Sequence, residues 1–123
     1  QKAILKQIGN QLAAMHEAGI KHADLHLKNL LVKDKQVFVI DLDNAKISNG
    51  PLGVFGATQN LLRFYRSIEK FRYQGGIFSQ TDWEETLTAY FGSANEKHRR
   101  FLFWQKAFKP VFWFHKLFWK QTA

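Results

Sequence analysis

A short loop crowded with polar and ionisable side chains constrains the fold of this chain more than any other feature. The loop runs from His22 to Asn29 after a helical pattern, and the apolar strand pattern that follows it ends directly at Asp41. A carboxylate at the end of a buried strand costs stability unless a cation or hydrogen-bond donors meet it. Folding alone does not require this concentration of polar groups, and functional residues gather on loops that a rigid scaffold positions. The sequence therefore predicts a functional site where the loop meets the end of the strand.

The elements on either side of the loop follow from the spacing of apolar residues. Residues 3–15 carry apolar side chains every three or four positions, which predicts an amphipathic helix that Gly19 ends. Segments 30–32 and 37–40 are short, apolar and joined by the polar residues 33–35. They predict a β-hairpin.

The second half of the chain is predicted to be helical after a further loop. Glycine and proline between residues 44 and 56 predict that loop. The predicted fold class is mainly α with a small β-hairpin (α+β). Three more helices are expected, one from Thr58 to a stop at Gly75-Gly76, one over 83–91 capped by Thr81 or Asp82, and one from Ser93 or Asn95 to a break at Pro110.

The composition limits the chain to one ordinary globular domain. With 123 residues, 46% hydrophobic and 23% charged, it fits one core and is neither collagen-like nor disordered. It has no cysteine, which excludes a disulfide scaffold and points to a reducing compartment. No apolar run is long enough to span a bilayer, and we expect no signal peptide. Because the first residue is Gln1 and not Met, we expect a missing upstream segment.

Five positions of the loop and strand match one pattern in register, H-x-D-L-x-x-x-N followed by D-x-D. They are His22, Asp24, Leu25, Asn29 and Asp41. The pattern resembles the catalytic loop and metal-binding motif of the protein-kinase-like fold. The resemblance implies that Asp24 orients an accepting hydroxyl and accepts its proton, while Asn29 and Asp41 hold Mg²⁺ through oxygen ligands. A turn capped by Asp and Asn is the alternative, and five matches in register outweigh it.

Three polar residues of the same segments have supporting roles by this resemblance. His22 is expected to pack against the metal-binding strand and fix the backbone, and His26 to touch the substrate. Asp43 is either a second metal or sugar ligand or a cap of the next loop. Ala23 stands where many protein kinases have an arginine that grips a phosphorylated loop, and Asp43 replaces the glycine of D-F-G. Switching by loop phosphorylation is therefore not expected.

A longer part of the chain, roughly residues 8–91, resembles bacterial lipopolysaccharide core kinases, and among them kinases of 3-deoxy-D-manno-octulosonic acid (Kdo). The resemblance implies ATP-dependent phosphorylation of a sugar hydroxyl on a lipid A precursor, at the cytoplasmic face of the bacterial inner membrane. It rests on His22-Ala23-Asp24-Leu25, Ile40-Asp41-Leu42-Asp43, the segment from Gln59 to Ser67, Trp83, and Ala89-Tyr90.

Two arginines on the helix expected from Thr58 are candidates for substrate binding. Arg63 and Arg66 are three positions apart and so share one helix face. They are expected to meet the anionic sugar or the lipid A phosphates. The alternative is that they are solvated charges or partners of Glu69.

The nucleotide-binding part of a kinase has no counterpart in this sequence. A kinase needs a glycine-rich loop and a strand lysine before the catalytic loop, whereas residues 1–19 are predicted to be a helix. Residues 1–123 therefore resemble the C-terminal lobe of a protein-kinase-like fold without its N-terminal lobe, and we expect the chain alone not to turn over ATP. Two other functions stay open: a non-catalytic module that docks on a membrane or partner, and a small-molecule kinase of the aminoglycoside or choline type.

Residues 96–123 form a basic, aromatic tail. Seven basic residues against Glu96 give the tail a net charge of +6 out of +8 for the whole chain, and it holds six Phe and three Trp. We expect core packing before Pro110 and contact with an anionic membrane surface after it, with the cations from Lys106 to Lys120 facing the lipid. Nucleic-acid binding is not expected, because no RNA- or DNA-binding motif accompanies the tail.

Overall fold

The chain folds into four α-helices with two small antiparallel sheets, in a computed structural model that describes residues 2–93 and 95–108. This arrangement confirms the predicted mainly α, α+β class. The elements in chain order are α1 (Lys2–Glu17), β1 (Ile20–Lys21), the 3₁₀ turn η1 (Leu27–Asn29), β2 (Leu30–Lys33), β3 (Gln36–Val39), β4 (Lys46–Ile47), α2 (Val54–Tyr73), α3 (Gln80–Phe91) and α4 (Glu96–Ala107).

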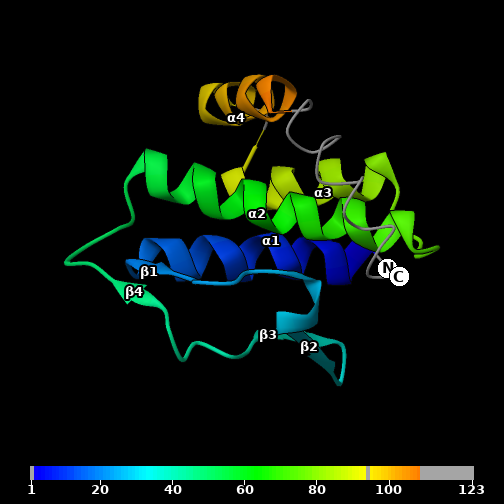
Figure 1. The fold of residues 1–123 in the computed structure, drawn as a ribbon, viewed down its shortest axis with the longest axis horizontal. Coiled ribbons are helices and arrows are strands. Elements are labelled where there is room, and N and C mark those ends of the chain that lie inside the picture. The colour runs from blue at the N-terminus through cyan, green and yellow to red at the C-terminus, as the bar shows by residue number, and fades with distance from the viewer. Residues whose placement is uncertain (1, 94, 109–123) are drawn as a thin grey trace.

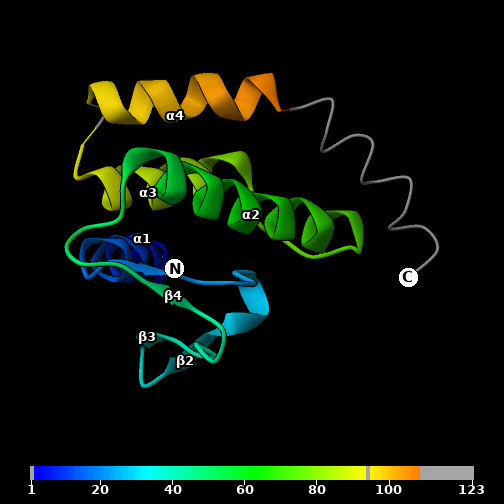
Figure 2. The same ribbon diagram turned by 60° about the vertical axis from the view of Figure 1, so that its left-hand side comes forward.

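The helices form stacked layers with the strands on one side. Helices α2 and α3 lie over α1, α4 covers them on the far side, and the hairpin β2–β3 lies beyond α1 (Figures 1 and 2). Gly9 allows α1 to approach α3 closely, because a Cβ atom there would lie 2.3 Å from the carbonyl oxygen of Thr86 and 2.8 Å from the nitrogen of Tyr90. Strand β1, just before the polar loop, and η1, at its end, both contact α2.

The core is centred on Trp83 of α3, whose side chain is fully buried. Its ring centroid lies 5.0 Å from that of Tyr65 and 6.2 Å from those of Phe64 and Phe101, within the range of favourable aromatic contacts. The apolar positions of α1 and α2 supply much of the rest, except that Ala3 is exposed and Ile4 and Leu62 are half-buried. The other fully buried apolar side chains are Leu12, Leu25, Leu61, Ile68, Leu87 and Val37.

The hairpin forms as predicted, with Leu30 opposite Val39 and Lys33 opposite Gln36. Its two-residue turn places Asp34 and Lys35 at φ values of 51° and 63°, the left-handed conformation that a tight hairpin turn requires. The second sheet was not predicted. Residues 46–47 of the expected loop form β4, which pairs with β1 and ties the chain after the hairpin back to the end of α1.

Two helix starts differ from the prediction. Helix α2 begins at Val54, so the expected loop ends before Gly56 and not after it. Helix α3 begins at Gln80 because Ser79 caps it: Ser79 Oγ accepts a hydrogen bond from Asp82 N (3.0 Å), and Asp82 Oδ2 accepts one from Ser79 N (2.9 Å). This reciprocal pair is a capping box, and it makes Asp82 the third residue of the helix and not its cap.

Helix α4 starts where the sequence predicts but packs differently. Asn95 caps it by accepting a hydrogen bond from His98 N. Phe101 is buried, whereas Phe103 is 65% exposed, Trp104 49% and Phe108 37%. The prediction that the aromatic residues before Pro110 pack into the core is therefore wrong for these three. Gln105 is buried and accepts a hydrogen bond from Trp83 Nε1 (2.8 Å), so it does not share the solvated face of the lysines.

The tail beyond Phe108 lies outside the described residues, and so do the expected helix break at Pro110 and the expected membrane-facing segment up to Lys120. Within residues 2–93 and 95–108, none of the helices has the length and apolar character needed to cross a lipid bilayer.

Candidate active site

The polar loop is anchored to α2 by the buried side chain of Asn60. Asn60 Oδ1 accepts a hydrogen bond from His22 N (3.1 Å), and Asn60 Nδ2 donates one to His22 O (2.8 Å). These two backbone groups fix the orientation of the amide, since a backbone N–H only donates and a carbonyl only accepts. The start of the loop is therefore held at both backbone polar groups of one residue, His22.

Two more buried residues extend this anchor to α1 and α3. His16 Nε2 lies 3.0 Å from Asn60 Oδ1, and His16 Nδ1 lies 2.5 Å from the hydroxyl of Tyr90. Since Asn60 Oδ1 only accepts, His16 donates from Nε2 and accepts the Tyr90 proton at Nδ1. Burial lowers the pKa of His16, with the Asn60 hydrogen bond partly opposing this, and burial raises the pKa of Tyr90.

The His22 side chain joins the loop to the end of the hairpin. Its Nδ1 accepts a hydrogen bond from Asp24 N (3.2 Å), so its Nε2 carries the proton and donates to Ile40 O (3.0 Å). One imidazole, 2% exposed, therefore bridges the backbone at Asp24 and the residue before Asp41. His22, Asn60, His16 and Tyr90 are referred to below as the buried polar network.

Asn29 and Asp41 lie at the same end of the hairpin. The Asn29 carbonyl accepts a hydrogen bond from Ile40 N (2.7 Å), which brings Asn29 next to the strand that leads into Asp41. The Asn29 side chain is buried, and its Oδ1 caps η1 by accepting a hydrogen bond from His26 N (3.0 Å). Asp41 is exposed and has a φ of 63°, a conformation that is uncommon outside glycine.

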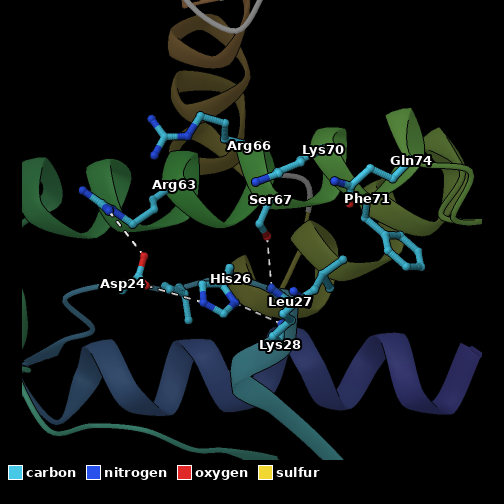
Figure 3. Close-up of a pocket in the computed structure, with 11 residues that line it drawn as sticks. Asp24, His26, Leu27, Lys28, Arg63, Arg66, Ser67, Lys70, Phe71 and Gln74 are labelled. Atoms are coloured by element: carbon cyan, nitrogen blue, oxygen red, sulfur yellow. Dashed lines mark hydrogen bonds and ion pairs between the residues drawn. The ribbon is translucent and has the colours of Figure 1, made fainter. Parts of the chain in front are cut away.

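A pocket of about 440 Å³ opens beside Asp24, between the loop and one face of α2 (Figure 3). Its volume lies within the range of small-molecule sites. Ser67 fixes the spacing of the two walls, because its Oγ accepts a hydrogen bond from Leu27 N (3.1 Å) and donates one to Phe64 O (2.6 Å). The pocket is lined by Asp24, Leu25, His26, Leu27, Lys28, Arg63, Arg66, Ser67, Lys70, Phe71 and Gln74.

The carboxylate of Asp24 stands between two cationic or protonatable groups. Arg63 Nη1 lies 3.8 Å from Asp24 Oδ1, and His26 Nε2 lies 3.6 Å from Asp24 Oδ2. Figure 3 shows Arg63 extending from α2 toward this carboxylate. Burial lowers the pKa of Arg66, the nearby Arg63 lowers it further, and Asp24 acts in the opposite direction. The Asp24 side chain is 76% exposed, so it is open to a ligand in the pocket.

The structure brings together only part of the predicted site. Asp24, His26, Arg63 and Arg66 line the pocket, whereas Asn29 and Asp41 do not. Asp43 is exposed. Across the described parts of the chain, no three His, Asp or Glu side chains group closely enough to hold a metal ion.

Sequence reasoning missed two lysines of the pocket and the anchor beneath it. Lys28 and Lys70 line the pocket, and the spacing 63, 66, 70 along a predicted helix was a signal that could have added Lys70 to the two arginines. The sequence gives Asn60 no role of its own beyond its place in the segment from Gln59 to Ser67. No sequence pattern marks its contact with a loop 38 positions earlier.

Comparison with known proteins defines the class of this chain. The family model described as the lipopolysaccharide kinase (Kdo/WaaP) family matches residues 1–90. The chain belongs to this family. Its relatives include the 3-deoxy-D-manno-octulosonic acid kinase of Vibrio parahaemolyticus, to which it is 38% identical over 71 residues, 56% of this chain and 28% of that protein.

Other relatives match over similar parts of the chain. The 3-deoxy-D-manno-octulosonic acid kinase of Vibrio cholerae is 35% identical over 75 residues, 60% of this chain and 31% of that protein. The KEOPS complex subunit Bud32 of Pyrococcus abyssi is 29% identical over 87 residues, 71% of this chain and 37% of that protein. The chain thus spans about a third of the length of these relatives. No solved structure matches it.

Proposed function

We propose that the chain is the acceptor-binding part of a kinase that transfers phosphate from ATP to a sugar hydroxyl, and that the sugar is Kdo in the inner core of lipopolysaccharide. Membership of the lipopolysaccharide kinase family and the relatives named for Kdo kinase activity support this proposal. The observation that carries it is the exposed carboxylate of Asp24 at the wall of a cationic pocket.

Asp24 is the residue that orients the accepting hydroxyl and takes its proton. Its backbone N–H is held by His22, and its carboxylate has Arg63 and His26 on either side. A carboxylate positioned in this way accepts a hydrogen bond from an alcohol in the pocket. It receives the proton as the alcohol oxygen attacks the γ-phosphorus of ATP and the bond to the departing ADP breaks. Positioned acid–base catalysis of this kind contributes about 10²- to 10⁴-fold to a rate.

Asn29 and Asp41 are the residues proposed to hold Mg²⁺. Their oxygen donors suit this ion, which takes one or two protein ligands together with substrate phosphates and water. The Asn29–Ile40 backbone bond supports the pairing, and the exposed Asp41 carboxylate is open to an ion. When bound, the ion neutralises charge on the phosphates. His22, His26 and Asp43 support these groups, and Arg63 and Arg66 bind the acceptor.

The same proposal includes an architecture and a location. We take residues 1–123 as the C-terminal lobe of a protein-kinase-like fold without its N-terminal nucleotide lobe, and we expect these residues alone not to turn over ATP. We place the protein at the cytoplasmic face of the inner membrane, bound through its basic tail. The exposed aromatic side chains of Phe103 and Trp104 beside Lys106 support contact with an anionic lipid surface.

The proposal is tested by phosphotransfer from ATP and Mg²⁺ to a Kdo-bearing lipid A precursor, in the full-length protein that carries this chain. Asp24→Asn and Asp41→Asn are each expected to lower turnover at least 100-fold with the fold intact. Asp34→Asn, in the exposed hairpin turn, is the matched control and keeps full activity. Near-normal turnover of Asp41→Asn would show that the metal assignment is wrong, and near-normal turnover of Asp24→Asn would remove the proposed base.

A further inference from the structure

The cations of the pocket outnumber the groups that balance them. Four cationic side chains line it, and Asp24 is the one carboxylate. Arg63 and His26 lie beside that carboxylate, whereas Lys28, Arg66 and Lys70 form no ion pair with any residue in the described ranges. Since like charges repel each other, a ligand that brings negative charge relieves this imbalance.

The three cations without an ion pair, Lys28, Arg66 and Lys70, come from both walls of the pocket within the described residues. Arg66 and Lys70 are four positions apart on α2, and Lys28 comes from η1 on the opposite wall of the pocket. The walls are held in place by Ser67, which binds the backbone of Leu27, and by the cap that Asn29 and His26 form on η1. A small anion between the walls therefore meets donors on rigid elements, which limits the ordering cost of binding.

The position of the pocket assigns the anion to the acceptor and not to the nucleotide. Asp24 lines the pocket, whereas Asn29 and Asp41, the residues proposed for the ion on the phosphates of ATP, do not. Phe71 and Leu27 add an apolar surface to the same pocket, which suits the carbon-bound hydrogens of a sugar ring. The pocket thus combines an acceptor for a hydroxyl proton, spare cations and an apolar wall.

We propose that this pocket binds a sugar acid, with Lys28 and Lys70 holding its carboxylate while one of its hydroxyls meets Asp24. The inference rests on the proposed sugar kinase function and adds how the acceptor is recognised. Arg66 completes the cationic end of the pocket. A neutral sugar of the same shape is a poor ligand, because the lysines then lose water without gaining a charged partner.

The test measures binding and needs no phosphotransfer. The 123-residue chain is titrated calorimetrically with free Kdo and with its methyl ester, which keeps the ring and removes the charge. Kdo is expected to bind at least tenfold more tightly than the ester, since hydrogen bonds to a charged group are about twice as strong as neutral ones. Magnesium-ATP and inorganic phosphate are titrated as separate arms to distinguish acceptor from nucleotide phosphate.

Variants assign the effect to the pocket. Lys70→Gln and Lys28→Gln are each expected to weaken binding of Kdo about tenfold and to leave binding of the ester unchanged. Lys33→Gln, on the exposed end of the hairpin, is the control and changes neither affinity. Circular dichroism verifies that each variant is folded, and Lys28, which is exposed, provides a variant with little risk to the core.

Three results would overturn the inference. The first is equal affinity for Kdo and its ester, and the second is no binding of either. The third is that the lysine variants lose binding of ATP or phosphate and that Kdo does not displace these ligands from the unsubstituted protein. Each of these leaves the proposed function standing on its own test, because turnover by the Asp24→Asn and Asp41→Asn variants is measured in a separate assay. Conversely, if the protein binds Kdo more tightly than its ester but shows no phosphotransfer, the proposed recognition stands and the proposed function fails.

Discussion

Two polar regions meet at the loop that carries Asp24, and they differ in whether their polar groups have partners within the protein. In the buried polar network, His16, His22, Asn60 and Tyr90 use their donors and acceptors on one another and on backbone groups. Within the described residues, no buried side-chain nitrogen or oxygen lacks a hydrogen-bond partner. In the pocket beside Asp24, lysine and arginine side chains line an open cavity in which Asp24 is the carboxylate.

The difference indicates what each region does. A satisfied polar network in a core fixes one backbone arrangement, and removal of a member leaves other groups buried without partners. Cations in an open pocket contribute little to stability, because water solvates them in the absence of a ligand. The network is therefore expected to hold the loop, and the pocket to bind what the loop acts on. The predictions that follow test this division on the chain itself.

The largest effect is expected at the centre of the network. Asn60→Ala leaves both backbone groups of His22 and the Nε2–H of His16 without their partner. Each buried unpaired group costs about 1–3 kcal/mol, so we expect a loss of about 3 kcal/mol in the free energy of unfolding, measured by urea denaturation. Asn10→Ala, on the exposed face of α1, is the control. A loss below about 1 kcal/mol would show that the network does not hold the loop.

The second effect is a pH dependence set by His16. Because its pKa is lowered in the folded state, the unfolded chain takes up a proton first as the pH falls below about 6.5. Stability from this group is complete above that pH and decreases as the pH falls toward the folded-state pKa, with a slope of at most about 1.4 kcal/mol per pH unit. His16→Gln removes the titration, so its stability should fall less between pH 7 and 5. Parallel curves for the two proteins would contradict the assignment.

A smaller loss is expected at the end of the network. Tyr90→Phe keeps the ring and removes the hydroxyl that donates to His16 Nδ1. We expect about 1 kcal/mol less stability, the usual value for one hydrogen bond. Asn10→Ala, on the exposed face of α1, again gives the baseline. Thermal or urea unfolding measures both.

The smallest effect is expected in the pocket. Lys70→Gln should change the free energy of unfolding by less than about 0.5 kcal/mol, since an unpaired surface cation contributes little. The same variant should weaken ligand binding. Substitutions in the network should therefore lower mainly the free energy of unfolding, and substitutions in the pocket should lower mainly the affinity for the ligand. A strong destabilisation by Lys70→Gln would mean that the pocket is part of the structural framework, and the comparison would fail.

The parts of the fold that follow local rules were predictable from the sequence. The apolar spacing of α1, the hairpin, the left-handed Gly92 after α3 and the Asn95 cap of α4 each depend on a few neighbouring residues. The pairing of β1 with β4 was not predictable, because two-residue strands carry no period. The cap at Ser79 was missed because Thr81 and Asp82 are equally plausible caps by residue type.

The candidate site was predictable only in part for the same reason. The motif predicts Asp24, Asn29 and Asp41 from their spacing in one loop and hairpin, and of these three Asp24 lines the pocket. The role of Asn60 depends on packing between segments 38 positions apart. Likewise, the presence of Lys28 and Lys70 in one pocket depends on how α2 packs against η1, and local propensities do not encode that packing.

The close approach at Gly9 gives the loop a dependence on a residue that never touches it. A methyl group at position 9 would press against the backbone of Thr86 and Tyr90 and move α3 outward. Tyr90 would then be displaced from His16, and the backbone of His22, which Asn60 holds next to His16, would lose part of its restraint. The geometry around Asp24 thus depends on Gly9, because the missing Cβ atom at that position lets α1 and α3 pack closely.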